Sequence, residues 1–253
     1  MCTQKYQIVA NVRIRRAASS MHRHPPISRL HIADLHSITP ADMEGCTDIL
    51  HVAFAAVSPK QASWDSLVKV KANILASTEL LSCAKSAGFK RFVAAGSRLE
   101  HGLTSNEYFK IPSSAQLLPV GTYTPTKAPS CLLLNAYAMD DLIEFYYGTI
   151  FNTYGPHQPP CNFWPSLKAA ARSGSDFRVT LGQQARDFVP VEDVVNHLLG
   201  ACLMDKHFSS WPLVENIGTG NGQSLYEFAL AEWKRLSAQG KILNGELPLR
   251  PTS

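Results

Sequence analysis

Short runs of apolar and β-branched residues recur along the first 155 residues and are separated by polar stretches. Runs of this length predict β-strands. The run at residues 48–53 is almost continuously hydrophobic, which is typical of a strand buried on both faces. The predicted strands are residues 6–12, 30–33, 48–53, 91–95 and 149–151.

Two helical patterns lie between these strands. Over residues 63–87 the apolar positions fall three, four and seven residues apart, and Gly88 follows as a stop signal. The apolar face of this helix comprises Leu67, Val70, Ile74, Leu81 and Ala84. A second helix is predicted from about Tyr123 to Ile143. Alternation of strands and helices predicts an α/β fold with a Rossmann-like parallel sheet covered by helices.

The second part of the chain is rich in loops and prolines and has shorter elements. Helices are predicted near residues 164–172 and 191–203, and strands at 186–189 and 213–218. Ser224 and Glu227 have the spacing of a capping box at the start of a last helix. We therefore expect residues 1–155 to form one α/β domain, which the family resemblance given below implies to be an incomplete Rossmann-like dinucleotide-binding domain. Residues 156–253 would form a substrate-binding part over the strand ends, where α/β sheets bind ligands.

Composition excludes several classes of protein. Hydrophobic residues make up 45% of the chain and charged residues 17%, as in globular proteins with a sizeable core. The net charge is only +4, and the basic residues are scattered except at residues 13–16 and 22–24, so nucleic-acid binding is not expected. No stretch approaches a membrane span of about 18 apolar residues, and no secretory signal is recognisable. A cytoplasmic protein is expected.

The six cysteines are widely spread, without a C-x-x-C pair or ligand-like Cys/His spacing. This distribution indicates small buried side chains in a reducing compartment rather than disulfide bonds or a metal site.

The candidate chemistry centres on Tyr123, Lys127 and Ser97. A Tyr and a Lys four residues apart share one face of a helix, where the ammonium lowers the pKa of the phenol and makes it useful for proton transfer. Ser97, at the end of the 91–95 strand, would hydrogen-bond the same substrate oxygen. Taken alone, the Tyr–Lys spacing is a weak signal and fits a surface Tyr beside a surface Lys better.

An ordered set of segments in this chain resembles the extended short-chain dehydrogenase/reductases, in particular the NAD-dependent epimerase/dehydratase family that modifies nucleotide sugars. Together the segments span roughly residues 6–235. They are His51-Val52-Ala53, Asn73 through Gly88, Lys90 to Val93, Gly96 through Gly102, Tyr123-x-x-x-Lys127, Phe151 to Pro156, Gln184 through Val195, and Asn216 to Gly220.

The resemblance implies a role for individual residues. Ser97, Tyr123 and Lys127 correspond to the family's catalytic triad, in which a proton and a hydride are exchanged with a sugar carbon. Asn152 and Arg186 correspond to sugar-nucleotide contacts, with Arg186 at the diphosphate. The cofactor, NAD or NADP, would meet Asp34, Leu35, Ala53 and Lys127. Asn73 corresponds to a helix residue that braces the active-site strand, and His51 is expected to be structural.

These residues also have simpler interpretations. Arg186 and Asp187 fit a surface ion pair, Asn152 a turn residue and Asp34 a cap. By resemblance the family also dimerises through two long helices, here residues 63–87 and 123–143, so a homodimer is expected.

The glycine-rich loop that binds the cofactor pyrophosphate in the family has no counterpart here, because no glycine precedes Gly45. The first predicted strand corresponds to the family's second, so we expect a Rossmann-like sheet lacking its first, central strand. Pro125 and Pro129 also disturb the predicted helix. One hypothesis is therefore an active epimerase, dehydratase or reductase with a misplaced start or recent truncation. The alternatives are an inactive relative that retains sugar-nucleotide binding or an oligomeric role, and a sensor that binds the dinucleotide without chemistry.

Overall fold

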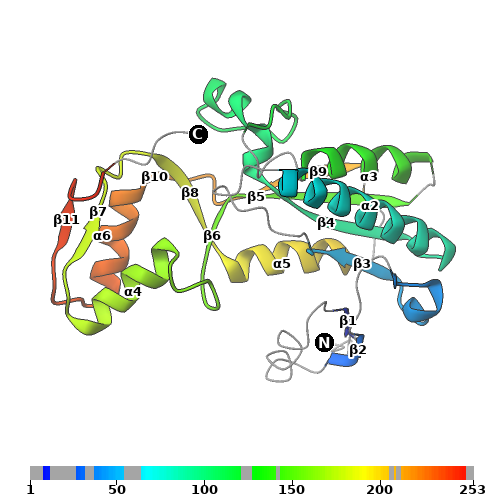
Figure 1. The fold of residues 1–253 in the computed structure, drawn as a ribbon, viewed down its shortest axis with the longest axis horizontal. Helices are drawn as coiled ribbons and strands as arrows, with labels where there is room; N and C mark the ends of the chain where they lie inside the picture. The colour runs from blue at the N-terminus through cyan, green and yellow to red at the C-terminus, as the bar shows by residue number, and fades with distance from the viewer. Residues whose placement is uncertain are drawn as a thin grey trace. The chain divides into compact units, whose positions relative to one another are not determined.

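The computed structural model describes residues 8–11, 27–31, 37–53, 64–120, 127–140, 143–204, 208 and 212–248. The chain divides into two compact units that interleave along the sequence. Unit 1 comprises residues 1–94, 122–147 and 204–213, and unit 2 comprises residues 95–121, 148–203 and 214–253. Both units mix helices with strands, so the α/β prediction is confirmed (Figure 1).

Two sheets contain the strands predicted in the first part of the chain. β1 (Ile8–Asn11) pairs in parallel with β2 (Ile27–His31) as a separate two-stranded sheet. A four-stranded sheet has the order β3-β4-β5-β9. Its strands are β3 (Asp48–His51), β4 (Arg91–Ser97), β5 (Glu144–Ile150) and β9 (Leu213–Ile217). β3 and β4 are parallel, with Asp48 opposite Arg91 and His51 opposite Ala94.

Burial differs sharply between β3 and its neighbours. In β4 and in β5 the first six residues are buried, whereas in β3 only His51 is buried. The prediction that this strand is buried on both faces is wrong. Among the described strands β3 has a neighbour on one side only, and a strand at an edge cannot be covered as an interior strand is.

α2 (Trp64–Ser86) and α3 (Ala128–Asp140), two helices of the described part of unit 1, lie side by side (Figure 1). α2 matches the predicted helix and buries Leu81 and Ala84, but Leu67 is 50% exposed, contrary to prediction. α3 begins later than predicted. Pro129 lies in its first turn, where a residue without an N–H is tolerated, and Lys127, directly before the helix, is a turn residue.

Unit 2 is built on a three-stranded sheet of order β10-β8-β6. β8 (Ala185–Pro190) runs parallel to β6 (Asn152–Tyr154) and antiparallel to β10 (Gly222–Ser224). α5 (Val191–Cys202) follows β8 directly. β7 (Phe177–Val179) and β11 (Ile242–Asn244) form a parallel pair beside α4 (Phe163–Ser173) and α6 (Leu225–Arg235) (Figure 1).

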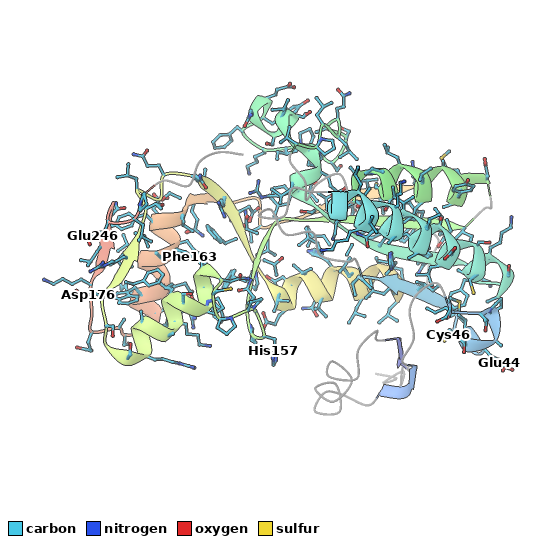
Figure 2. The ribbon with its side chains drawn as sticks, in the orientation of Figure 1. Glu44, Cys46, His157, Phe163, Asp176 and Glu246 are labelled. Atoms are coloured by element: carbon cyan, nitrogen blue, oxygen red, sulfur yellow. The ribbon has the colours of Figure 1, made fainter. Side chains whose placement is uncertain are left out.

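Aromatic side chains form the core of unit 2. Phe188 of β8 stacks on Phe228 of α6 with ring centroids 3.9 Å apart, and Tyr154 of β6 meets the same ring edge-on. Phe163 at the start of α4 (Figure 2) packs against Phe177 of β7, with their centroids 5.7 Å apart. These contacts join α4, α6 and both small sheets into one core.

The capping box predicted for α6 is confirmed. The Ser224 hydroxyl accepts a hydrogen bond from the Glu227 amide at 3.1 Å, and the Glu227 carboxylate accepts one from the Ser224 amide at 2.7 Å. These reciprocal bonds satisfy two backbone donors that the helix cannot satisfy itself.

The five described cysteines are free thiols. Cys131 and Cys202 are buried, but Cys161 is exposed, which corrects the expectation that all are buried. In the described part of the chain no helix is long and apolar enough to cross a membrane.

Candidate functional site

Ser97 ends β4 and caps the short 3₁₀ helix η3 (Arg98–His101). Its Oγ accepts a hydrogen bond from the Leu99 amide at 3.3 Å, and its own amide donates to the Glu100 carboxylate at 2.6 Å. The hydroxyl acts only as an acceptor in this cap, so its proton is left to donate to another oxygen. That is the role the sequence predicts for Ser97.

A glycine closes the turn after η3. Gly102 has a φ of 51°, and its Cα lies so near the Leu118 carbonyl that a Cβ would overlap it. The Leu103 amide donates to the same carbonyl at 3.1 Å. This close approach folds the segment holding η4 (Leu103–Glu107) back on the end of η3.

Asn152 is the first residue of β6 rather than a turn residue. Its Oδ1 accepts a hydrogen bond from Nε of Arg98 at 3.3 Å, and its Nδ2 donates to the Asp187 carbonyl at 3.4 Å. Both ends of the amide are therefore engaged, and Asn152 links the end of β4 to β8 within unit 2.

Arg186 and Asp187 point in different directions, because successive residues of a strand face opposite sides of the sheet. Arg186 donates to Oε1 of Gln184 at 2.7 Å. The Asp187 carboxylate accepts bonds from the Thr219 amide at 3.0 Å, the Thr219 hydroxyl at 2.6 Å and the Gly220 amide at 2.8 Å. Asp187 thus fixes the turn after β9, and the surface ion pair considered from the sequence is not formed.

The positive charges of Arg98 and Arg186 act on each other. Burial, and then the nearby charge of Arg186, lower the pKa of Arg98 from its usual value. Within the described ranges no acidic side chain pairs with Arg98. Arg98 and Arg186 therefore place two positive charges in the same part of unit 2.

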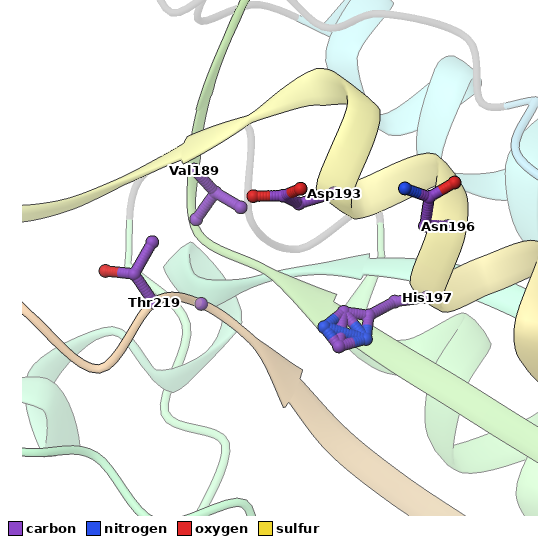
Figure 3. A pocket seen from close by; sticks show the side chains of 6 residues that line it. Val189, Asp193, Asn196, His197 and Thr219 are labelled. Atoms are coloured by element: carbon purple, nitrogen blue, oxygen red, sulfur yellow. The ribbon is translucent and has the colours of Figure 1, made fainter.

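A hollow of about 390 Å³ lies elsewhere in unit 2 (Figure 3). Asp193, Asn196 and His197 of α5 line one side, and Val189, Gly218 and Thr219 complete it. Val189 shares a strand face with Asp187 and not with Arg186, because residues two apart face the same side. The hollow is therefore distinct from the arginine pair.

Two predicted site residues lie in unit 1. The Lys127 carbonyl accepts the hydrogen bond of the Cys131 amide at 2.9 Å, so Lys127 precedes the first turn of α3 instead of lying within a helix. Ala53 is exposed two residues after β3. Asp34, Leu35 and Tyr123 lie outside the described residues.

His51 is a buried residue of unit 1, as the sequence suggested. It is 2% exposed, and its Nε2 lies 3.0 Å from Oγ of Ser77 on α2. Burial, followed by the positive charge of Lys127, lowers its pKa to about 4. His51 is therefore neutral at neutral pH and supports the packing of β3. Asn73, on the same helix, is buried as well.

Arg98 is the site residue that the motifs did not reveal. The sequence does place a cation directly after Ser97, but a single Arg matches no recognisable spacing. Its importance depends on contacts with β6 and β8, which lie far along the chain.

Comparison with known proteins gave one family and many similar structures. The model of the NAD dependent epimerase/dehydratase family matches residues 3–210. No match was found among curated proteins.

Three solved structures illustrate the structural likeness. A UDP-glucose 4-epimerase from Thermotoga maritima, with UDP-glucose, has a TM-score of 0.79 at 20% identity, covering 97% of this chain and 79% of its own. A UDP-N-acetylglucosamine 4-epimerase from Methanobrevibacter ruminantium has a TM-score of 0.78 at 20% identity, with coverages of 92% and 75%. A UDP-glucuronic acid 4-epimerase from Bacillus cereus has a TM-score of 0.77 at 18% identity, with coverages of 94% and 78%. At these identities the likeness shows the fold.

Proposed function

The chain belongs to the NAD dependent epimerase/dehydratase family, and from this premise we propose that it binds a nucleotide sugar and acts as an epimerase, dehydratase or reductase. The observation that carries the proposal is the site formed by Arg98, Asn152 and Arg186 in unit 2. Similar folds hold UDP-sugars, among them the Thermotoga maritima epimerase with UDP-glucose. The residues of unit 2 offer what a diphosphate needs, which is fixed positive charge with directed donors.

Arg186 is the proposed contact to the diphosphate. It lies on β8, whose neighbours in the sheet are β10 and β6, and Gln184 holds one of its terminal nitrogens at 2.7 Å. Gln184 orients this guanidinium, and the planar geometry of an arginine side chain matches phosphate oxygens. Asn152 orients the neighbouring Arg98 by accepting its Nε–H.

Proton transfer is proposed for Ser97, Tyr123 and Lys127. The free hydroxyl proton of Ser97 would hydrogen-bond the reacting sugar oxygen. Tyr123 would exchange the proton with that oxygen, and Lys127 would keep the phenol acidic enough to do so. This assignment follows the family motif residue by residue.

The family is NAD-dependent, but the described residues contain no glycine-rich turn at a helix N-terminus that could bind the pyrophosphate of NAD or NADP. Their one glycine-rich run, residues 218–222, continues into β10 and not into a helix. The amides of Thr219 and Gly220 within it already donate to Asp187. The residues proposed to meet the cofactor are Ala53, Lys127, Asp34 and Leu35, of which the last two lie outside the described residues. When bound, NAD or NADP would accept and return the hydride, and no residue in the described ranges is assigned to that step.

The second candidate function is suggested by the lack of a pyrophosphate-binding turn among the described residues. In it the chain is an inactive relative that binds the sugar nucleotide and performs no chemistry. A titration with NADH and NADPH, monitored by nicotinamide fluorescence, distinguishes the two candidate functions. Micromolar binding supports the enzyme, whereas no binding up to millimolar cofactor by the folded protein supports the inactive relative.

Arg186→Gln tests the binding site directly. Calorimetric titration with UDP-glucose should show about tenfold to a hundredfold weaker binding by the variant, because a charged hydrogen-bond partner of the diphosphate is lost. Arg178→Gln is the matched control, since Arg178 is an exposed arginine of the same unit on β7. Equal affinities of wild type and Arg186→Gln would contradict the assignment.

A homodimer is part of the proposal. Large apolar side chains on the two helices of unit 1 are exposed, which is uncommon on a monomer surface. They are Leu67, Val68 and Leu75 on α2, and Leu132, Tyr137 and Met139 on α3. Sedimentation of the wild type at twice the mass of one chain, and of Leu75→Lys at one chain mass, is the expected result. A monomeric wild type would contradict this part. A cytoplasmic location is also proposed.

A further inference from the structure

Residues 103–118 form a segment of unit 2, called the flap, that contains η4 and follows η3. Backbone hydrogen bonds close the flap at its two ends. The Leu103 amide donates to the Leu118 carbonyl at 3.1 Å, and the Leu118 amide donates to the His101 carbonyl at 3.3 Å. Opening the flap therefore breaks the bonds that hold it against the end of η3.

The flap buries little apolar surface. Its buried residues are Thr104 and Ala115, and its other residues are exposed or partly exposed. A bond of 2.7 Å from Nδ2 of Asn216 on β9 to the Ile111 carbonyl attaches its middle. A segment with few buried apolar contacts opens at a lower free-energy cost than the remainder of a domain.

The residue beneath the flap is His101, which is 1% exposed. The backbone of Ala115 and Gln116 and the side chain of Asn216 lie near its ring. Even so, both ring nitrogens of His101, Oγ1 of Thr104 and Oδ1 of Asn216 are buried and make no hydrogen bond with the described residues. Buried polar atoms without partners lose their hydration and destabilise the closed state, whereas in an open flap water satisfies them.

The surroundings of His101 are neutral. Burial lowers the pKa of the imidazole from its usual value, although the nearby polar groups act in the opposite direction. No described charged or titratable side chain on the adjoining elements contributes to this shift. These side chains are Arg98 and Glu100 on η3, Glu107, Tyr108 and Lys110 on the flap, and Glu215 on β9.

We propose that the flap is an acid-sensitive switch, which is closed on η3 while His101 is neutral and opens when His101 takes up a proton. Above about pH 6.5 the ring is neutral in the closed and in the open state. Below this pH the open state takes up a proton that the closed state excludes, so acid favours opening. Because η3 begins directly after Ser97, the switch acts on the support of the helix that carries Arg98.

Hydrogen exchange of the full chain at pH 7.5 and pH 5.5 tests the switch. Each rate is divided by the intrinsic rate of the same amide at that pH, which gives a protection factor. In the wild type the protection of the Leu103 and Leu118 amides should fall by up to about tenfold at the lower pH, as expected for one proton taken up on opening.

His101→Gln removes the titrating group and keeps a polar side chain. Its flap should have the same protection at both pH values, even if that protection is lower than in the wild type. His197→Gln is the matched control, since His197 is an exposed histidine on α5 of the same unit, and its flap should behave as in the wild type. The amides of α6 should respond to pH equally in all three proteins.

Two results of the exchange experiment overturn the inference. One is constant protection of the flap in the wild type, and the other is an equal fall in the wild type and in His101→Gln. If His101→Gln does not fold, an NMR titration of the wild type replaces it. The inference requires that His101 titrates below pH 6.5, and titration at about 6.5 overturns it. These experiments use no nucleotide sugar, so their failure leaves the proposed function standing.

Discussion

Strands β3 and β8 each lead to residues that the sequence assigns to a ligand, but the two strands are supported very differently. β8 pairs with β10 through its first half and with β6 through its second, and Phe188 stacks on Phe228. β3 pairs with β4 alone among the described strands, and only His51 is buried. The proposed sugar-nucleotide site therefore lies on a strand that pairs with a strand on each side and packs against α6. The proposed cofactor residue Ala53 follows an edge strand.

The first prediction concerns the stability of the interior strands of unit 1, β4 and β5. Arg91 donates to the Glu144 carboxylate through Nε at 3.0 Å and Nη2 at 2.8 Å, and both side chains are buried. Glu144→Gln should cost about 3–5 kcal/mol in the free energy of unfolding, because it leaves a buried charge without its partner. Urea denaturation measures this cost.

The matched control is the double variant Arg91→Met with Glu144→Leu, which removes both charges. It should recover most of the lost stability. A cost below about 1 kcal/mol is typical of an exposed ion pair and would contradict the burial of Arg91 and Glu144 between the interior strands.

A second prediction concerns the edge strand and pH. The pKa of His51 in the folded protein is lowered to about 4, below the ordinary value of about 6.5 in an unfolded chain. Above pH 6.5 the imidazole is neutral in the folded and in the unfolded chain, so its titration does not lower the stability there. As the pH falls toward 4, the unfolded chain takes up a proton that the folded chain excludes, and about 3 kcal/mol of stability is lost.

His51→Gln removes this titration. Thermal unfolding between pH 7 and pH 4.5 should therefore show a smaller loss of stability on acidification for the variant than for the wild type. Parallel pH profiles of the two proteins would show that His51 is not excluded from water at the edge strand.

The third and smallest effect concerns the turn beside β8. Asp187→Ala removes the acceptor of three hydrogen bonds from Thr219 and Gly220. Because these groups are exposed and water replaces the carboxylate, the expected cost is about 1–2 kcal/mol. Faster hydrogen exchange at the amides of residues 219 and 220 is the specific readout. Asp187→Asn, which keeps an acceptor oxygen, should lie between the variant and the wild type.

Several long elements were predicted well because their periodicity is carried by many residues, but most of β5 was missed, since a strand was expected only at residues 149–151. α2, α5, β4 and β8 were all anticipated within one or two residues. The three-residue strands β6, β7, β10 and β11 were missed, since three positions are too few to show an alternating pattern. The burial predicted for β3 was wrong. An apolar run shows which side chains a strand can bury, but it does not show how many strands lie beside it.

Site prediction from the sequence divides in the same way. Ser97 and Asn152 stand in motifs, so their identity as candidates required only local patterns. The state of Arg98 depends on Asn152 and Arg186, which come close to it only in the folded chain. Whether a charge is balanced is a property of contacts between distant segments, and no local pattern encodes it.

Hydrogen exchange of the full chain with and without saturating UDP-glucose tests the central claim, that unit 2 holds a formed sugar-nucleotide site. The expected result is slower exchange in β8 and in residues 97–102, with the amides of α2 unchanged. Slower exchange in β3 and α2, with none in β8, would contradict the account.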